Sequence, residues 1–343
     1  MIISGYDLHC VYFTLNFTIS VVGLACNIRC PEPVTSRGRS HNTDSVSLLT
    51  TAADNHGYGL AAPTIGMDKA TLSSVTEIGR VALTVADPPP VVDFYRDVVG
   101  LAVLDSGDDR TILGAGGQAL LVLNHRPDAP ARDSAGTGLY HVAFRVPSRA
   151  ALGDALRRID SEWTLSGASD HGVSEALYLS DPAGNGVEIY RDFPRASWSE
   201  TPSGHVEMVT EPLDTQAVAS AAGGEQSMPA ESDIGHVHLE VSSVETARSF
   251  YVDALGLRVR ATYDGAVFLA AGDYHHHVGA NVWQGRSKPH HGQGLAWFEV
   301  RLPDDATLDA TRERLRRSGY AVSETDTGLT VHDGDDIELR LRT

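Results

Sequence analysis

The sequence predicts an α+β protein made of two similar domains, each built from a pair of βαβ-type modules. Three observations support this fold class: a repeat at one fixed offset, a weaker repeat inside each half, and alternating strands that lead into amphipathic helices. The 343 residues are enough to bury two hydrophobic cores. We expect domains at residues 76–194 and 233–343, joined by a linker at 195–232.

The stronger repeat joins two pairs of segments at the same offset and without a gap. Residues 78–85 (IGRVALTV) match 234–241 (IGHVHLEV), and residues 94–101 (FYRDVVGL) match 250–257 (FYVDALGL). In each half an alternating strand passes through a turn into an amphipathic helix, which a following glycine terminates. The repeat therefore indicates a domain duplication.

A second unit of strand, helix and strand recurs later in each half. It is expected at residues 138–146, 150–159 and 187–191, and again at 294–302, 308–318 and 337–341. The linker is rich in Ser, Ala, Gly, Glu and Pro, and we expect it to pack in part around Trp198 and residues 206–209. Each half is thus predicted to contain two modules.

The charge balance excludes one class of partner. The net charge is −18, and lysine occurs only as Lys69 and Lys288. A nucleic-acid-binding protein needs a basic face to neutralise phosphates, so no nucleic-acid partner is expected. An acidic surface of this kind suits a cytoplasmic protein of a salt-loving organism, because salt screens the repulsion between like charges. An ordinary acidic enzyme is the alternative.

The first 66 residues do not fit the repeat. They contain all three cysteines, so the rest of the chain has no thiol for catalysis, disulfides or zinc. Residues 11–26 form the most apolar run, but polar residues interrupt it, and we expect no membrane partner. We interpret residues 1–66 as a disordered or non-native extension with Met67 as the natural start; a genuine anchor or targeting segment is the alternative.

Short motifs add a family likeness to the repeat. They are residues 235–239 (GHVHL), the two Phe-Tyr helices, and residues 180–190 (SDPAGNGVEIY), 274–283 (YHHHVGANVW) and 337–339 (IEL). With these motifs the chain resembles the vicinal oxygen chelate superfamily of glyoxalases, bleomycin resistance proteins and extradiol dioxygenases, and within it the two-domain catechol 2,3-dioxygenase-like branch. The resemblance covers about residues 78–342. It implies tandem domains of paired βαβββ modules, each pair forming a half-open barrel with a divalent metal on its concave wall.

The resemblance also implies metal ligands on the first and last strands of the modules. In the second domain these strands supply His236, one of the histidines at 275–277, and Glu338, whereas Trp297 at the matching first-strand position cannot bind a metal. Two histidines and one carboxylate form the facial set of non-haem Fe(II) enzymes. Fe(II) is therefore the expected cofactor, with Mn(II) as the alternative.

Strand alternation helps to choose among the three neighbouring histidines. His276 lies in the more apolar row, whereas His275 and His277 share the other row with Gly279, which leaves room near a ligand. We predict that His277 is the ligand and that His275 is a nearby acid or base. An exchange of these roles stays open.

The first domain has a weaker set of donors. Arg80 takes the position of His236 and Leu121 that of His277, while His141 and Glu188 are present. Two donors beside an arginine make a poor divalent site, so we expect this domain to be without a working metal site and to support the other. Whether His141 and Glu188 bind a second metal or pair with each other stays open.

The predicted function is that of an Fe(II)-dependent extradiol dioxygenase, an oxidoreductase that cleaves a small catechol-type aromatic with O2. Asn281, Trp283 and Trp297 are expected to line the substrate site. Better-known enzymes of the family carry a further His and a Tyr in the last module, and the segment between Tyr320 and Glu338 offers no equivalents.

Two other functions compete with this prediction. One is another metal-dependent lyase or transferase of the superfamily, although a glyoxalase is expected to keep four ligands and Trp297 argues against that. The other is a resistance-type protein that binds a small molecule without catalysis and lacks metal ligands. Assembly into a homo-oligomer is compatible with any of the three.

Overall fold

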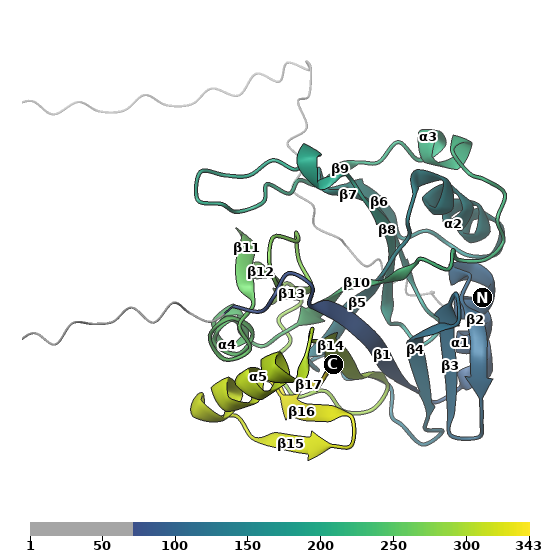
Figure 1. Ribbon diagram of the computed structural model, residues 1–343. Coiled ribbons are helices and arrows are strands. Elements are labelled where there is room, and N and C mark those ends of the chain that lie inside the picture. The colour runs from purple at the N-terminus through teal and green to yellow at the C-terminus, as the bar shows by residue number, and fades with distance from the viewer. Residues whose placement is uncertain (1–70) are drawn as a thin grey trace, which may run out of the picture. The chain divides into compact units, whose positions relative to one another are not determined.

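The computed structural model describes residues 71–343 (Figure 1). The expectations for residues 1–66 and for Met67 lie outside this range. Within it, no helix is both long and apolar enough to span a membrane.

The first half of the described chain contains two modules. Module 1 comprises β1 (Glu77–Val85), α1 (Pro88–Asp93) with a π-helical continuation (Phe94–Val99), β2 (Ala102–Ser106), β3 (Arg110–Ala115) and β4 (Gln118–His125). Module 2 comprises β5 (Gly138–Arg145), α2 (Arg149–Glu162), β6 (Gly167–Asp170), β7 (Ser174–Ser180) and β8 (Gly186–Asp192).

The second half repeats this order after the linker. The linker holds a 3-10 turn (Arg195–Ser197), β9 (Glu211–Pro212) and α3 (Thr215–Ser220). Module 3 comprises β10 (Asp233–Glu240), α4 (Val244–Arg248) with a π-helical continuation (Ser249–Ala254), β11 (Arg258–Tyr263), β12 (Ala266–Ala270) and β13 (Val278–Asn281). Module 4 comprises β14 (Gly294–Arg301), α5 (Asp305–Arg317), β15 (Val322–Thr325), β16 (Gly328–His332) and β17 (Glu338–Arg342).

Local sequence signals explain where the helices begin and end. The side chains of Ser148 and Asp304 accept hydrogen bonds from backbone N–H groups in the first turns of α2 and α5, as N-caps do. The helices of modules 1 and 3 are followed by Gly100 and Gly256, whose φ angles of 93° and 96° suit glycine. These ends match the duplication seen in the sequence.

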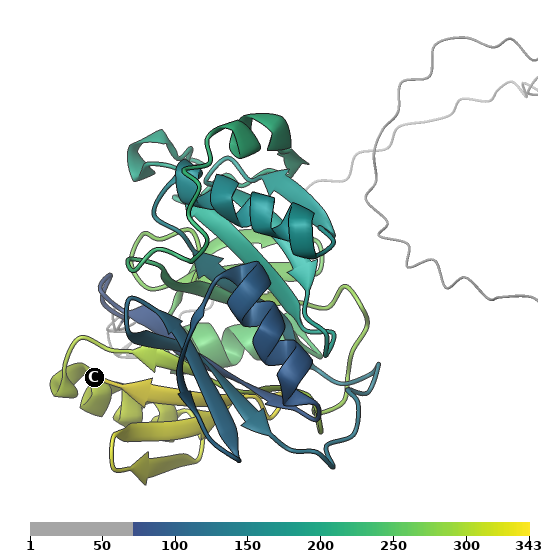
Figure 2. The same ribbon diagram turned by 90° about the vertical axis from the view of Figure 1, so that its right-hand side faces the viewer.

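Two sheets collect the strands of residues 71–343, and each sheet combines one module from each half of the chain. One sheet, here called the 1–4 sheet, has the order β15-β16-β17-β14-β1-β4-β3-β2. The other, the 2–3 sheet, has the order β11-β12-β13-β10-β5-β8-β7-β6-β9. Figures 1 and 2 show α2 beside the strands of module 2 and α5 beside those of module 4. The predicted tandem modules are confirmed, but successive modules do not share a barrel: modules 2 and 3 form one and modules 1 and 4 the other.

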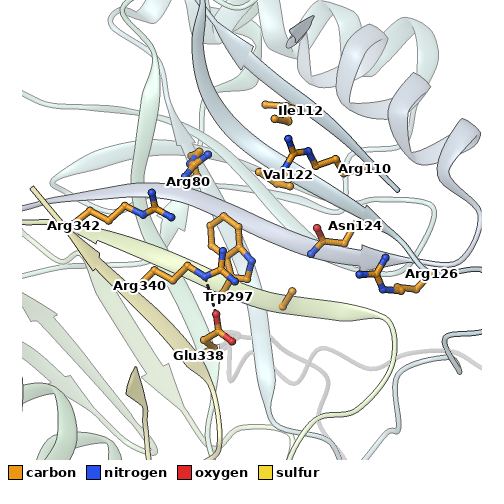
Figure 3. Close-up of a pocket in the computed structure, with 11 residues that line it drawn as sticks. Arg80, Arg110, Ile112, Val122, Asn124, Arg126, Trp297, Glu338, Arg340 and Arg342 are labelled. Carbon is orange, nitrogen blue, oxygen red and sulfur yellow. Dashed lines mark hydrogen bonds and ion pairs between the residues drawn. The ribbon is translucent and has the colours of Figure 1, made fainter. Parts of the chain in front are cut away.

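The strand register makes the four modules directly comparable. Val142 pairs with Val237 in the 2–3 sheet, and Val81 pairs with Phe298 in the 1–4 sheet, each between antiparallel first strands. Each module therefore has one residue at an equivalent place on its first strand, directly before these paired residues, here called the first-strand position. In modules 1 to 4 these residues are Arg80, His141, His236 and Trp297. A matching last-strand position is held by Val122, Glu188, Gly279 and Arg340. Figure 3 shows the members of both positions that belong to the 1–4 sheet.

A β-bulge precedes the first-strand position in both sheets. In the 2–3 sheet, Tyr140 and Gly235 are the extra residues between consecutive strand partners. A bulge turns neighbouring side chains toward the same face, so the simple alternation of the strand is interrupted there. The residue that follows each bulge points to the concave face, away from the core.

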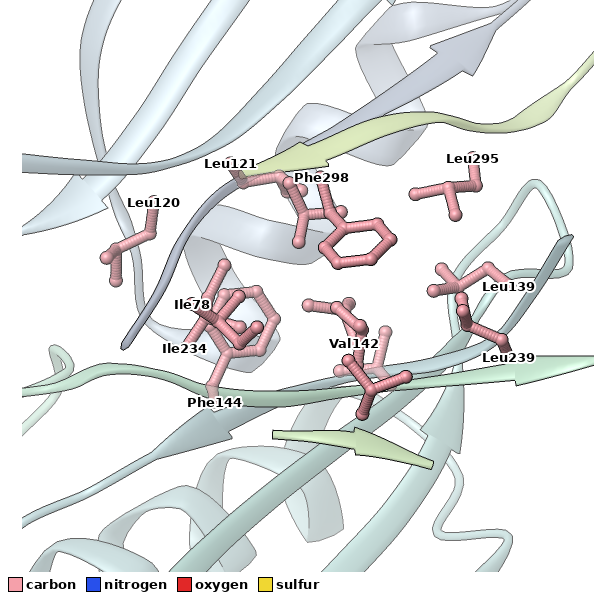
Figure 4. Close-up of a cluster of buried hydrophobic side chains, with 14 of the residues drawn as sticks. Ile78, Leu120, Leu121, Leu139, Val142, Phe144, Ile234, Leu239, Leu295 and Phe298 are labelled. Atoms are coloured by element: carbon pink, nitrogen blue, oxygen red, sulfur yellow. The ribbon is translucent and has the colours of Figure 1, made fainter. Parts of the chain in front are cut away.

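The hydrophobic core lies between the two sheets. Ile78 and Phe298 of the 1–4 sheet belong to the same buried cluster as Val142, Phe144 and Ile234 of the 2–3 sheet (Figure 4). These side chains are all at most 5% exposed. Because the core holds one face of each first strand, the alternate residues face the two concave walls, where functional side chains can gather.

Candidate metal centre

Three donor atoms meet on the concave face of the 2–3 sheet. His141 on β5, Glu188 on β8 and His236 on β10 are each at most 6% exposed, and their donor atoms lie within 4.8 Å of one another. Glu188 Oε2 lies 2.9 Å from His141 Nε2 and 3.2 Å from His236 Nε2. The two Nε2 atoms are 3.4 Å apart.

This donor set fits a divalent metal. Ligands at about 2.1 Å from a metal in neighbouring octahedral positions stand about 3 Å from each other, close to the three observed separations. Two histidines and one carboxylate on one face are the facial set of non-haem Fe(II) sites. The Nε2 atoms of both histidines face the same oxygen of Glu188. Lone pairs on these three atoms repel one another unless a cation or a proton lies between them.

The electrostatics favour the protonation states that metal binding needs. Burial lowers the pKa of His236 to about 4, although Glu188 works against that shift. Burial would raise the pKa of Glu188, but His236 and His141 outweigh it and hold that pKa well below its ordinary value. Near neutral pH His236 therefore offers a neutral imidazole and Glu188 an ionised carboxylate, the forms in which these groups bind metals.

The fourth equivalent position carries no donor. Gly279 lies where Glu188 lies in the neighbouring module, and the ring of His238 fills the space that a side chain there would need. An added Cβ on Gly279 would lie 2.7 Å from His238 Cδ2. His238 is buried, its ring centroid is 5.0 Å from that of His141, and its Nε2 atom has no hydrogen-bond partner in the described residues. The centre thus combines three clustered donors with a histidine whose Nε2 atom has no hydrogen-bond partner in the described residues.

A tyrosine and a histidine of module 2 complete the polar groups around the centre. Tyr178 on β7 pairs directly with Glu188 across the sheet. Its hydroxyl lies 2.7 Å from His171 Nε2. Burial, together with the nearby Glu188 charge, holds the pKa of Tyr178 well above its ordinary value, so the hydroxyl stays protonated. The sequence prediction looked for such a His and Tyr in module 4 and missed them because it placed the metal there.

Aromatic rings line the same concave face. His238 makes edge contacts with Tyr140, Phe268 and Trp283 at centroid distances of 5.2, 5.4 and 5.4 Å. Trp283 is 50% exposed and lies at the margin of this group, while Phe268 also contacts His276. Flat apolar surfaces beside a metal-ligand cluster suit a planar aromatic ligand.

The predicted ligand set is only partly brought together. His236 is in the cluster, but Glu338 lies on β17 of the 1–4 sheet, where it pairs with Arg340 at 2.7 Å. The register accounts for this separation: Arg340 is the residue equivalent to Glu188, and Glu338 stands two positions earlier. A shift of two residues keeps the same face of a strand, so alternation could not reveal it.

The same two-residue shift separates His277 from Gly279, the last-strand position of module 3. His277 Nδ1 accepts a hydrogen bond of 3.2 Å from the Ala271 N–H, and burial lowers the pKa of His277 to about 3. The ring of His276, which the sequence prediction set aside, has its centroid 4.1 Å from that of His236, closer than the ring of His275 at 6.1 Å. None of the three belongs to the donor cluster.

The remaining predicted residues have mixed positions. Both ring nitrogens of His275 have partners, Nε2 with Asp192 at 2.9 Å and Nδ1 with His276 at 2.7 Å. Asn281 is fully buried and bonds to backbone atoms. Trp283 lies beside the centre, whereas Trp297 lines a pocket of the other sheet. His141 and Glu188, assigned to a domain without a metal site, are two of the three clustered donors.

Comparison with known proteins agrees with the duplicated fold. The sequence model of the glyoxalase/bleomycin resistance protein/dioxygenase superfamily matches residues 77–189 and 233–334. A protein of Bacillus subtilis named catechol-2,3-dioxygenase is 41% identical over 269 residues, which cover 75% of this chain and 94% of that protein.

Solved structures show the same fold at lower identity. A Bacillus subtilis protein assigned as a dioxygenase is 15% identical with a TM-score of 0.57, covering 80% of this chain and 86% of its own. A variant of glyoxalase I from Zea mays is 17% identical with a TM-score of 0.50, covering 78% of this chain and 93% of its own.

Proposed function

Since the chain belongs to the glyoxalase/bleomycin resistance protein/dioxygenase superfamily, we propose that it is an extradiol dioxygenase that cleaves a catechol-type aromatic with O2. His141, His236 and Glu188 would hold Fe(II), with Mn(II) as the alternative metal. The observation that carries the proposal is the convergence of these three donors within a wall of aromatic rings. The relative named catechol-2,3-dioxygenase supports the reaction class.

The donor set favours an oxygenase over a four-ligand lyase. Gly279 offers no ligand at the fourth equivalent position, so only His141, His236 and Glu188 would hold the metal, as in the three-residue sites of non-haem Fe(II) oxygenases. Bound Fe(II) would supply Lewis acidity toward the vicinal hydroxyls and electron exchange with O2. The reaction places one atom of O2 in a new carboxylate and the other in a new aldehyde, and it breaks one carbon–carbon bond of the ring.

The surrounding residues orient the ring and move its protons. Phe268 and Trp283 provide flat contact surfaces and exclude water from the centre. Within residues 71–343 the Nε2 atom of His238 has no hydrogen-bond partner. His238 would accept the proton of the second hydroxyl and return it later, a role first assigned to His275. The protonated hydroxyl of Tyr178 would donate a hydrogen bond to a developing oxyanion while His171 fixes its orientation.

The decisive experiment compares two glutamates. After anaerobic iron loading, Glu188→Ala should contain little iron and show no O2 uptake with catechol, because an anionic ligand is gone. Glu338→Ala should keep its iron, since that carboxylate contacts Arg340 in the other sheet. Both variants should give the unfolding transition of the native fold. Iron lost from Glu338→Ala and kept by Glu188→Ala would place the metal in the second domain, as the sequence alone predicted.

A second measurement separates catalysis from binding alone. The iron-loaded native chain should consume one O2 per catechol and form a yellow ring-opened product, which is followed by its absorbance. Catechols with different ring substituents would define the substrate. Iron binding without O2 uptake on any of them would favour a lyase or transferase of the same superfamily, and the absence of both would favour a resistance-type binding protein.

A further inference from the structure

The concave face of the 1–4 sheet contains a pocket rich in arginine. It has a volume of about 400 Å³. Its wall contains five arginines, the apolar side chains Ile112, Val122, Ala296 and Trp297, and the polar residues Asn124 and Glu338 (Figure 3). The five arginines are Arg80, Arg110, Arg126, Arg340 and Arg342.

This pocket stands at the place that holds the donor cluster in the 2–3 sheet. The first-strand positions carry Arg80 and Trp297 instead of two histidines. The last-strand position that corresponds to Glu188 carries Arg340. The same location of the duplicated fold has therefore changed from residues that attract a cation to residues that repel one.

Part of this positive charge is neutralised inside the protein. Glu299, which is 1% exposed, forms ion pairs of 2.7 Å with Arg80 and Arg342. Glu338 pairs with Arg340 at 2.7 Å. Two carboxylates, Glu299 and Glu338, thus form ion pairs with three of the five arginines and fix the positions of their guanidinium groups.

The other two arginines have no acidic partner in the described part of the chain. Arg110 begins β3 and Arg126 follows β4, and both side chains are exposed. The only side-chain hydrogen bond recorded for this pair within residues 71–343 runs from Arg126 to the His125 carbonyl. The whole chain has a net charge of −18, so the excess of positive charge in this pocket is opposite in sign to the charge of the protein as a whole.

Trp297 adds a flat apolar surface to the charge. Its ring lies 4.0 Å from the guanidinium carbon of Arg340 and 5.7 Å from that of Arg80, and the residue is 7% exposed. Val122 and Ile112 pack in the same small cluster. Guanidinium groups bind carboxylates through paired, charge-assisted hydrogen bonds, while the apolar wall favours a ligand with a flat body.

We infer that the 1–4 half-barrel is a second binding site, separate from the metal centre, for a small organic anion with a flat apolar body and a carboxylate. Arg110 and Arg126 bind the carboxylate, and the body lies against Trp297. This site does not depend on the proposed dioxygenase activity, because none of its residues belongs to the donor cluster.

Calorimetric titration of the full-length chain tests the inference with benzoate, phthalate, benzamide and inorganic phosphate as probes. Benzoate and phthalate should bind saturably at millimolar concentrations or below, and added salt should weaken them. Benzamide, which has the same ring without the charge, should not bind. His141→Ala, whose donor cluster is broken, should bind benzoate like the native chain, which separates this site from the metal centre.

Variants locate the binding. Arg110→Gln and Arg126→Gln should each weaken benzoate binding by roughly tenfold, the loss of one charge-assisted contact. Both side chains are exposed, so folding should be unaffected. Arg258→Gln is the matched control, since Arg258 is an exposed arginine of the other sheet paired with Asp273.

Several results would overturn the inference. They are the absence of saturable binding, equal binding of benzamide, or benzoate affinity that is unchanged in both Arg110→Gln and Arg126→Gln. Phosphate binding as tightly as benzoate, with no dependence on Trp297 in a Trp297→Leu variant, would show a general anion site and overturn the organic class. Loss of benzoate binding in Arg258→Gln would show that benzoate does not bind in the pocket of the 1–4 sheet.

Discussion

The 2–3 sheet and the 1–4 sheet place different chemistry at the same four positions. The 2–3 sheet has His141, His236, Glu188 and Gly279 there, and the 1–4 sheet has Arg80, Trp297, Arg340 and Val122. The backbone register determines which side chains lie together on each concave face. The residue types at these positions determine whether the face attracts a cation or an anion. A duplicated scaffold can thus keep its geometry in both copies while only one copy has the His/His/Glu donor cluster.

The largest effect should come from exchanging the first-strand residues of the two sheets for alanine. His141→Ala should abolish O2 uptake and remove most of the iron. The loss of metal affinity should exceed the roughly 100-fold loss that follows when a residue supporting a ligand is removed. Arg80→Ala removes a residue at the equivalent position and should keep the iron content of the native chain. Metal analysis after anaerobic loading measures both; equal iron loss would mean that the two sheets are not functionally distinct.

The next effect concerns His238, which has Glu299 as its counterpart in module 4. His238→Ala should lower kcat by about 10²–10⁴-fold, the usual contribution of a general base, with iron content unchanged. Steady-state O2 uptake with catechol gives kcat. If the variant loses its iron as well, His238 acts as a ligand and not as a base.

A smaller effect is expected from adding one methyl group to a glycine in each sheet. A Cβ on Gly279 would lie 2.7 Å from His238 Cδ2, and one on Gly79 would lie 2.8 Å from Glu299 Cβ. Each Gly→Ala variant should lose about 1–3 kcal/mol of unfolding free energy through overpacking. Only Gly279→Ala should also lower turnover, because it displaces His238. Thermal unfolding and O2 uptake on both variants make the comparison.

The last comparison concerns stability alone and a feature that the two sheets share. Tyr95 donates a hydrogen bond of 3.1 Å to Asp181 before β8, and Tyr251 donates one of 2.9 Å to Asp333 before β17. Burial raises the pKa of Asp333 to about 6, against an ordinary 3.8. A raised folded-state pKa means that its stabilisation is complete below about pH 4 and is lost as the pH rises through about 6.

The loss should reach about 3 kcal/mol at most. Asp333→Asn should remove this pH dependence from the unfolding free energy, measured by urea titration between about pH 4 and pH 7. Asp181, whose pKa burial also raises, allows the same test in the 2–3 sheet through Asp181→Asn. An unchanged pH profile in Asp333→Asn would show that another group titrates there.

The sequence predicted the modules well because their signals are local. The alternating strands, and Gly100 and Gly256 at the ends of the helices, are signals that act within a few residues of themselves. The partners of each module could not be predicted, since all four first strands have similar patterns and any two could pair. Contacts such as Val142 with Val237 are decided only when whole modules pack.

The residues of the candidate cluster were predicted in part for the same reason. His236 was predicted as a donor and lies in the cluster, because a first strand can be aligned by its own pattern. Glu338 was preferred to Glu188 because it lies in the same half of the chain as His236, whereas Arg80 and Leu121 occupy donor positions in the half that contains Glu188. The two-residue shift between Glu338 and Arg340 keeps the same strand face, so alternation did not reveal it. No local signal reports that His141 of one half meets His236 of the other.

The nesting of one module pair inside the other has a consequence for the order of folding. The strands that carry His141 and His236 are 95 residues apart along the chain, whereas Arg80 and Glu299 are separated by 219. Longer loops cost more entropy to close, by about 0.6 kcal/mol for each doubling, and long-range contacts form more slowly. During synthesis modules 2 and 3 can assemble once module 3 has emerged, while module 1 must wait for the last module. We expect the donor cluster to form before the C-terminal strands close the opposite sheet.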